Sequence, residues 1–268
     1  MAELVQYVYA VVGADASLDG VPTGIDEARV EIQAEGSVAA LVSALDASVY
    51  GGPPLETRTG DLEWLGPRAR AHDHVVTWAS ESTATVPLPM FTMFRDRDGV
   101  RSMLRERRDE LGRGLERVRG RQEYGIRLFR IDDALTAHLA ELSPRIAELD
   151  RSAAAASPGQ RYLLTRKIEA ERVSELRRIG SEVAQRAFDE LSAHASGAVL
   201  DTLPRRTLEG MAGVAVLNAS FLLPRADTDS FRRTLTTLVE EYEPRGFRFE
   251  FTGPWPPYHF VQETQGER

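Results

Sequence analysis

Cysteine is absent from the 268 residues, and lysine occurs once, as Lys167. Without cysteine the chain has no disulfide, no thiolate nucleophile, no iron–sulfur cluster and no cysteine-type zinc site. The lack of disulfides fits a reducing compartment. The N-terminal residues MAELVQYVYA contain an acid and too short an apolar run for a signal peptide. We therefore expect a cytoplasmic protein.

The sequence also lacks long apolar runs and the common catalytic motifs. No stretch reaches the length needed to span a bilayer, so we expect no membrane partner. There is no Walker-type phosphate loop, no GxGxxG after a strand, no HExxH and no GxSxG. These absences favour a protein that is not an enzyme and holds no cofactor. With 28% charged and 42% hydrophobic residues, the composition is that of a soluble globular protein.

Positive charge is in deficit, because the formal net charge is -8. A nucleic-acid-binding surface needs a positive field, which the chain as a whole does not provide. The region 95–130 is the exception, with twelve arginines against seven acids. It could bind nucleic acid or an acidic protein. Acids interleaved at helical spacing and the lack of stacking aromatics favour a third interpretation, a solvated face with ion pairs.

His72, Asp73 and His74 form the one cluster that resembles metal ligands. Apolar residues around it recur every three or four positions, which predicts a helix that begins near Asp61. On a helix, side chains two positions apart point in different directions, so His72 and His74 would not share a metal. We predict a partly buried His72, solvated Asp73 and His74, and no metal site. An enzyme using these histidines is kept as an alternative.

The first 120 residues predict an α+β domain. The stretch 85–94 is strand-like but contains Pro87 and Pro89, so it should lie at a sheet edge or contain a bulge. The helix after it is predicted to begin at Asp98 and to end at Gly120. The other elements are strands at 6–12 and 28–34, a further strand or short helix at 38–45, and the helix that begins near Asp61.

Residues 121–268 predict a second α+β domain. The apolar stripe from Leu135 to Leu149 predicts a helix that Pro144 kinks or splits. A further helix should begin at the capping box of Ser157-Pro158-Gly159-Gln160 and run to about His194. An anion site at this helix start is disfavoured, because the capping box already satisfies the free N–H groups. The other elements are strands at 124–131, 214–223 and 247–251, and a helix at 231–242.

The stretch FTGPWPPYHF, residues 251–260, gathers three prolines, a glycine and four aromatics. Proline lacks the N–H that a sheet needs, so the prolines should end the last strand. Trp255, Tyr258 and Phe260 then follow on a stiff, extended backbone. They either cover the open end of the second-domain sheet, which we favour for Trp255, or face a partner.

Five stretches of the chain together resemble the gas vesicle protein F/L family: YVYAVV, WLGPRARAHDHVV, SPGQRYLL, VLNASFLL and TGPWPPY. The resemblance runs from about Gln6 to Val261, and TGPWPPY is its most specific element. The chain departs from the family at PLPMFTMF, residues 87–94, where an Arg-Phe-Gly-Thr run is usual.

The resemblance implies a non-enzymatic accessory protein of gas vesicles, the gas-filled protein shells that give some prokaryotes buoyancy. It implies an N-terminal α+β domain, here residues 1–120, and a C-terminal ferredoxin-like domain with added helices, here residues 121–268. It also implies two kinds of partner, the major shell protein and other accessory proteins. The protein would assist vesicle assembly or form a minor vesicle component.

A small hydrophobic shell subunit would aggregate unless a soluble partner shielded it before assembly. We expect the chain to contact this subunit through an apolar or edge-strand surface. Candidate contact residues lie in two segments: Met90, Phe91 and Phe94 in the 85–94 stretch, and Trp255, Tyr258 and Phe260 near the end of the chain. No residue is assigned a catalytic, metal-binding or cofactor-binding role.

Overall fold

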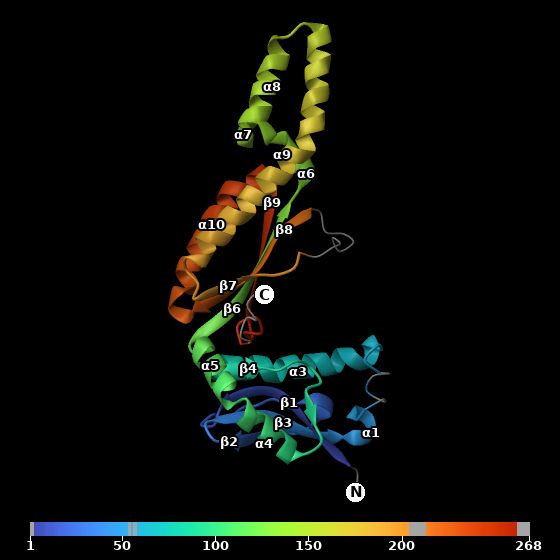
Figure 1. Ribbon diagram of the computed structural model, residues 1–268, viewed down its shortest axis with the longest axis vertical. Helices are drawn as coiled ribbons and strands as arrows, with labels where there is room; N and C mark the ends of the chain where they lie inside the picture. Colours follow the sequence, from blue (N-terminus) through green and yellow to red (C-terminus); the bar gives the residue numbers. More distant parts are fainter. Residues whose placement is uncertain (1–2, 53–54, 56–57, 204–212, 262–268) are drawn as a thin grey trace. The chain divides into compact units, whose positions relative to one another are not determined.

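The structure is a computed structural model that describes residues 3–52, 55, 58–203 and 213–261. The chain divides into two compact units. Unit 1 combines Met1–Glu123 with Pro254–Arg268, and unit 2 is Tyr124–Gly253. Each unit contains a β-sheet with helices packed on it (Figure 1), which confirms the predicted mixture of helix and sheet. None of the described helices has the length and apolar character that a membrane crossing requires.

The sheet of unit 1 is built around β1 (Leu4–Gly13), which pairs with three other strands. The strand order is β2-β3-β1-β4, and β5 also pairs with β1. The stretch 38–45, for which the sequence left strand or helix open, forms a strand that pairs antiparallel with β1 along nine residues. The bounds of the partners are β2 (Glu31–Glu35), β3 (Val38–Asp46), β4 (Thr85–Pro87) and β5 (Met93–Phe94).

The two prolines of the 85–94 stretch divide it as the sequence predicts. β4 pairs with Ala10–Val12 of β1, and β5 pairs with Gln6 and Tyr7 of the same strand. The residues between them, Leu88–Thr92, form a loop that we call the β4–β5 loop. Because proline cannot donate to the ladder, the segment stays at the edge and pairs in two short pieces.

Helices cover both faces of the unit 1 sheet. α3 (Leu62–Ser82) packs on the face that carries Tyr7, Tyr9 and Leu41, while α4 (Arg97–Glu106) and α5 (Arg108–Val118) pack on the sheet from the other side (Figure 1). This explains why YVYAVV is apolar without alternation, since side chains on both faces are buried. Two short elements complete the unit: η1 (Ile25–Glu27) and α1 (Ala47–Tyr50).

The predicted helix start at Asp98 is wrong by two residues. The N-cap is Asp96, whose Oδ1 accepts a hydrogen bond of 2.8 Å from the Gly99 backbone N–H. The predicted single helix is also two helices, because the chain departs from helical geometry at Arg107. The apolar stripe was predicted correctly and is buried: Leu104, Leu111, Leu115 and Val118.

Unit 2 has a four-stranded sheet in the order β7-β8-β6-β9. The element order is strand, helices, strand, strand, helix, strand. The sequence prediction missed β7, whose four residues GAVL are too few for a periodic signal; it pairs antiparallel with β8. The bounds are β6 (Arg121–Arg130), β7 (Gly197–Leu200), β8 (Val214–Pro224) and β9 (Phe247–Trp255).

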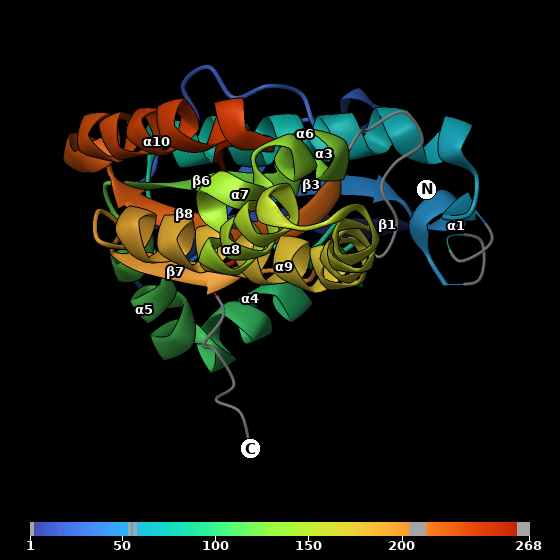
Figure 2. The ribbon, with the colours of Figure 1, turned by 90° about the horizontal axis from the view of Figure 1, so that it is seen from above.

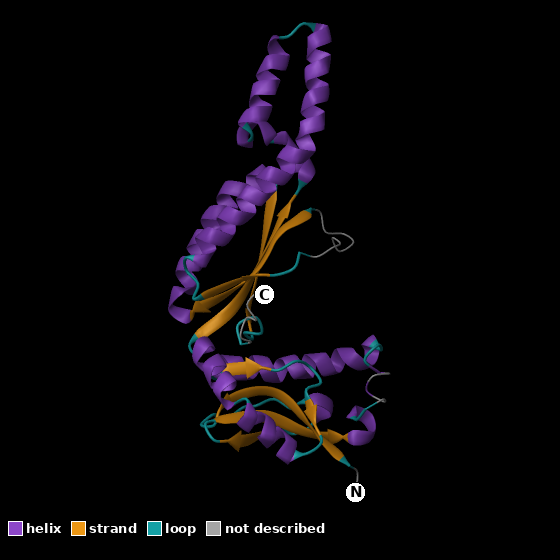
Figure 3. Ribbon diagram, viewed as in Figure 1, coloured by secondary structure: helices purple, strands orange, loops and turns teal. Residues whose placement is uncertain are grey.

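The second half of α9 (Pro158–Ser192) and α10 (Thr228–Tyr242) cover one face of this sheet (Figure 3). The first half of α9 extends past the sheet and pairs with α8 (Pro144–Ala155) as a helical hairpin (Figure 1). Pro144 splits the 135–149 stretch as predicted and occupies the first turn of α8. The remaining elements are α6 (Asp132–Ala137), α7 (Leu139–Leu142), η2 (Arg225–Asp227) and η3 (Glu243–Arg245).

The end of the chain differs from the prediction in two ways. β9 continues through Pro254 to Trp255, beyond the point where the prolines were expected to end it. Because β9 is an edge strand, a proline that cannot donate is tolerated there. The residues that follow, Pro256–Val261, belong to unit 1, although the sequence prediction assigned them to the second domain. We call Pro256–Val261 the C-terminal segment.

Candidate functional site

The two segments predicted from the sequence to contact a partner lie in the same unit. Unit 1 contains the β4–β5 loop, with Met90 and Phe91, and the C-terminal segment, with Tyr258 and Phe260. The structure brings these segments together at one residue of α3, His72. We describe this region, from His72 outward, as the candidate site.

His72 is positioned by a well-capped helix. Asp61 is the N-cap of α3, and its Oδ1 accepts from the backbone N–H groups of Glu63 at 2.9 Å and Trp64 at 3.3 Å. From this start, helical periodicity points His72 toward the sheet, where it is 5% exposed. Asp73 and His74 are exposed, as predicted. The described residues contain no group of three or more His, Cys, Asp or Glu that could hold a metal ion.

Both ring nitrogens of His72 meet tyrosine hydroxyls. The Tyr7 hydroxyl of β1 lies 2.8 Å from Nδ1, and the Tyr258 hydroxyl of the C-terminal segment lies 3.3 Å from Nε2. The Tyr7 hydroxyl also accepts a hydrogen bond of 3.1 Å from the backbone N–H of Phe91. Having accepted there, Tyr7 can donate to Nδ1, which leaves the imidazole proton on Nε2. A continuous chain of hydrogen bonds therefore joins the β4–β5 loop to the C-terminal segment.

This hydrogen-bonded chain is uncharged at neutral pH. Burial lowers the pKa of His72 to about 4, because the imidazolium would lose its hydration. Burial also raises the pKa of Tyr258 to about 12, with a further contribution from the negative charges of Asp73 and Glu123. The pKa of Tyr7 is raised, again mainly by burial. Groups with these pKa values are poorly matched to acid–base catalysis near pH 7. We therefore assign this series of hydrogen bonds a structural role, in which it holds the two segments in place.

Phe91 packs within unit 1. Its ring stacks on Trp64 with centroids 6.0 Å apart and meets the edge of Tyr7 at 6.2 Å. Its backbone has φ +63°, a left-handed conformation that is uncommon for an aromatic residue. The hydrogen bond to Tyr7 and the stacking on Trp64 hold it there. Met90 and Phe94, the other two predicted residues of this stretch, are half-buried.

The C-terminal segment is held at three further points. The backbone N–H of His259 donates to Oε2 of Glu123 at 3.2 Å, and its Nδ1 lies 2.6 Å from Oε1 of the same carboxylate. Nη1 of Arg117 donates to the backbone carbonyl of Phe260 at 3.2 Å. Phe260 is 6% exposed, so the predicted contact residue is part of the core. Trp255 and Tyr258 remain 49% and 38% exposed.

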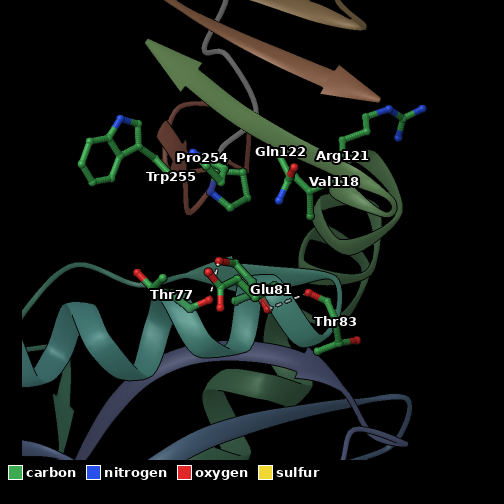
Figure 4. Close-up of a pocket in the computed structure, with 11 residues that line it drawn as sticks. Thr77, Glu81, Thr83, Val118, Arg121, Gln122, Pro254 and Trp255 are labelled. Atoms are coloured by element: carbon green, nitrogen blue, oxygen red, sulfur yellow. Dashed lines mark hydrogen bonds between the residues drawn. The ribbon is translucent and has the colours of Figure 1, made fainter. Parts of the chain in front are cut away.

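A small pocket lies beside Trp255 (Figure 4). Thr77 and Glu81 of α3 line one side, and Pro254 and Gln122 line the other, with the indole of Trp255 pointing away from Gln122. Trp255 is the last residue of β9 and is 49% exposed, and its covering of the open end of the second-domain sheet stays a prediction. The lining carries one carboxylate, Glu81, and one guanidinium, Arg121, among otherwise uncharged side chains.

The arginine-rich region 95–130 forms many ion pairs. Several of its guanidinium groups contact carboxylates of the same unit, as the interleaved acids indicate. These pairs offset part of the positive charge and favour the solvated-face interpretation over nucleic-acid binding. The pairs are Arg97 with Glu31, Arg101 with Asp98, Arg105 with Glu35, Arg107 with Glu110 and Arg119 with Glu116.

Sequence reasoning found His72, Tyr258 and Phe260 but missed Tyr7, Arg117 and Glu123. Tyr7 was counted only as part of a buried strand. A buried phenol needs a hydrogen-bond partner, and this requirement was the available signal that it meets His72. No local signal identifies Glu123 or Arg117, because their partners lie over 130 residues away along the chain.

Comparison with known proteins identifies the family. The family model of the gas vesicle synthesis proteins GvpL/GvpF matches residues 5–262. The chain belongs to this family. It is 34% identical to gas vesicle protein L of Streptomyces sp. (strain CB03234) over 270 aligned positions, which cover 97% of this chain and 96% of the relative. It is 26% identical to gas vesicle protein L1 of Halobacterium salinarum, over 96% of this chain and 90% of the relative.

Solved structures share the fold of this GvpL/GvpF family member. The crystal structure of GvpF from Anabaena sp. PCC7120 superposes with a TM-score of 0.71 at 18% identity, covering 98% of this chain and 100% of that chain. GvpF from Microcystis aeruginosa gives a TM-score of 0.65 at 17% identity, covering 97% and 99%. At this level of identity the likeness establishes the architecture. The family match establishes that this is a gas vesicle protein.

Proposed function

We propose that the protein is a non-enzymatic accessory protein that binds the hydrophobic shell protein of gas vesicles, during assembly or as a minor vesicle component. The observation that carries this proposal is the GvpL/GvpF family match across residues 5–262. We place its action in the cytoplasm, at the growing or finished vesicle, in support of buoyancy. Other accessory proteins of the vesicle are further partners in this proposal.

The physical reason for such a protein lies in the shell itself. A shell whose inner face repels water needs subunits with a large apolar surface, and these associate non-specifically before they assemble. A partner with a net charge of -8 stays dispersed and can present a small apolar contact on a charged surface.

The contact that we propose is formed by Trp255 and Tyr258. Both are aromatic and both remain substantially exposed. Tyr258 lies in the C-terminal segment, which is fixed at His72, Glu123 and Arg117, and Trp255 ends β9 directly before that segment. A fixed aromatic side chain loses little conformational entropy on binding, which is why Trp and Tyr dominate many interfaces. Met90 and Phe94, which are half-buried, are kept as further candidates, whereas Phe91 and Phe260 pack within unit 1.

We also propose that unit 2 is a ferredoxin-like domain with an added helical hairpin, and that unit 1 is the N-terminal α+β domain. The strand–helix–strand–strand–helix–strand order and the strand order β7-β8-β6-β9 support this assignment for unit 2.

Co-purification of the full-length protein with the major shell protein tests the proposed function. The variants are Trp255→Ala, Tyr258→Phe and the double variant Trp255→Ala/Tyr258→Ala. The double variant should reduce the recovered shell protein at least tenfold, because two exposed aromatic anchors are removed. Tyr258→Phe keeps the ring and should retain most of the binding.

The matched control is Leu200→Ala, which removes an exposed apolar side chain from β7 in unit 2, outside both proposed surfaces. It should leave shell-protein recovery unchanged. Circular dichroism confirms that each variant is folded. Full recovery of shell protein by the folded double variant would rule out the Trp255/Tyr258 surface. A wild-type chain that never retains the shell protein would rule out the proposed function itself.

A further inference from the structure

The first half of α9, which pairs with α8 in the helical hairpin, carries a row of exposed side chains on the side away from α8. Leu164 and Ile168 are half-buried in the hairpin, whereas the residues on the other side of the helix are exposed. Figure 2 shows the hairpin nearly end-on, with α8 and α9 side by side. The exposed row follows helical spacing of four, four, three and four residues. We call it the α9 stripe: Tyr162, Arg166, Ala170, Val173 and Arg177, with Leu163 beside Tyr162.

The apolar members of the α9 stripe are strongly exposed. Tyr162 is 63% exposed, Leu163 is 67% exposed and Val173 is 52% exposed. Isolated apolar residues on a surface need no explanation, but three large ones on one helix face, flanked by charges, are typical of an interaction site.

The charge around the stripe is opposite in sign to that of the whole chain. Across the span of the stripe, residues 162–177, four basic residues stand against three acids, a net of +1, although the chain has a net charge of -8. Arg161 is used within the hairpin, where its Nε donates to the Ala153 carbonyl at the end of α8, at 3.1 Å. Within the described part of the chain, Arg166 and Arg177 have neither a hydrogen bond nor an ion pair. The stripe therefore offers two guanidinium groups without a partner, one on each side of Ala170 and Val173 along the helix.

The hairpin is held firmly at its base, so the α9 stripe is presented on a fixed element. The Ser143 hydroxyl donates to Oε2 of Glu175 at 2.6 Å, and both residues are buried. Nη2 of Arg145, on α8, donates to Oε1 of Glu171, on α9, at 2.9 Å. A surface whose backbone is fixed in advance loses less entropy when a partner binds.

We propose that the α9 stripe is a docking surface for an acidic amphipathic helix of another protein. The helical spacing of Tyr162, Leu163 and Val173 fits the side chains of a second helix packed along α9. Carboxylates on the flank of that helix would pair with Arg166 and Arg177, which sets its charge and its orientation.

Two other kinds of occupant fit less well. A single-stranded nucleic acid would need a longer basic track and several stacking rings, but the stripe has two arginines and one aromatic ring. Anionic membranes bind clusters of about four to eight basic residues, and the acidic chain would be repelled from them. The inference does not rest on the proposed function, because the stripe lies in unit 2 and Trp255 and Tyr258 lie in unit 1.

Site-specific photocrosslinking tests this proposal. The full-length protein carries a benzophenone amino acid at position 163 and is the only copy in cells that form gas vesicles. Mass spectrometry then identifies the crosslinked peptide. We expect one dominant peptide from another protein, with an amphipathic helical pattern and more acids than bases. Its yield should fall at least tenfold in Arg166→Glu/Arg177→Glu and persist in Arg166→Lys/Arg177→Lys.

The matched control places the same benzophenone at position 172, an exposed residue on α9 outside the stripe. It should not produce the dominant peptide. Crosslinks to a second copy of this chain, to RNA, to lipid or to a basic peptide would overturn the proposal, as would an unchanged yield after charge reversal or no crosslinked peptide at all. Recovery of shell protein by the charge-reversed variant, measured as above, separates a failure here from a failure of the proposed function.

Discussion

His72 is the residue at which the β4–β5 loop and the C-terminal segment meet. Its Nδ1 faces Tyr7, which holds Phe91, and its Nε2 faces Tyr258. A buried polar group is stable only when its hydrogen bonds are made, so this imidazole makes the two segments depend on each other. The proposed contact surface at Tyr258 therefore depends on a residue that is itself almost inaccessible.

Titration of His72 should destabilise unit 1 in mild acid. The pKa of His72 is about 4 in the folded state, against an ordinary value of 6.5. Between pH 4 and pH 6.5 the imidazole is therefore protonated in the unfolded chain and neutral in the folded chain. The stabilisation from this group is complete above pH 6.5 and is lost as the pH falls toward 4, by up to about 3 kcal/mol. In His72→Gln the amide can keep both hydrogen bonds and does not titrate.

Urea unfolding between pH 7 and pH 4 measures this effect. All three tryptophans, Trp64, Trp78 and Trp255, lie in segments of unit 1, so their fluorescence reports on that unit. The wild-type free energy of unfolding should fall more steeply with acid than that of His72→Gln. The surrounding carboxylates, including Asp73 and Glu123, are the same in both proteins, so their contribution cancels in the comparison. Parallel curves would show that His72 does not contribute.

At the scale of the element, the start of α4 shows how a local signal can mislead. Asp96 and Asp98 both precede the same apolar stripe, and either is chemically suitable as an N-cap. The structure uses Asp96, because β5 ends at Phe94 and the chain must turn there. The side chain of Asp98 is 89% exposed and has only a 3.5 Å contact with Arg101.

Alanine substitution at the two positions should separate the cap from its neighbour. Asp96→Ala removes the acceptor for the Gly99 N–H and should lower the free energy of unfolding of unit 1 by about 1 kcal/mol. Asp98→Ala should change it by less than about 0.5 kcal/mol, since exposed substitutions outside special features have small effects. Tryptophan fluorescence during urea unfolding measures both. Equal losses in the two variants would contradict the assignment of the cap.

Across the two units, the last residues that the structure describes belong to the same unit as the first. β9 completes the sheet of unit 2, and the C-terminal segment then belongs to unit 1. Pro256, Pro257, Phe260 and Val261 are buried there. The packing of unit 1 is therefore complete only when the last described residues are in place.

A chain that stops after Trp255 should be destabilised in one unit only. It keeps β9 but loses the buried Phe260 and Val261 and the contacts of His72 and Glu123 with the segment. We expect a loss of about 3 kcal/mol or more in unit 1, from the burial of those two side chains alone. Hydrogen exchange followed by mass spectrometry should show faster exchange in peptides of β1 and α3 and unchanged exchange in peptides of β8 and α10. Faster exchange of equal size in both units would contradict this.

Short-range signals in the sequence were enough to predict the local elements and the family. Periodicity and capping residues predicted β1, α3, the division at Pro144 and the capped start of α9, because each of these depends on neighbours within a few turns of chain. The stretches shared with the family, above all TGPWPPY, predicted a gas vesicle protein. β7 has too few residues to show a periodic pattern, so the sequence did not predict it. The choice between Asp96 and Asp98 as the N-cap depends on where β5 ends, which the sequence does not show.

The place of the C-terminal aromatics depends on contacts that form only when the chain folds. Local sequence says that three prolines stiffen the chain, but it does not say which of two sheets the next residues meet. That choice depends on pairings between residues far apart in sequence: Tyr258 with His72, His259 with Glu123 and Phe260 with Arg117. Hydrogen bonds and buried area between distant segments leave no periodic signal in the chain, so they become visible only when it is folded.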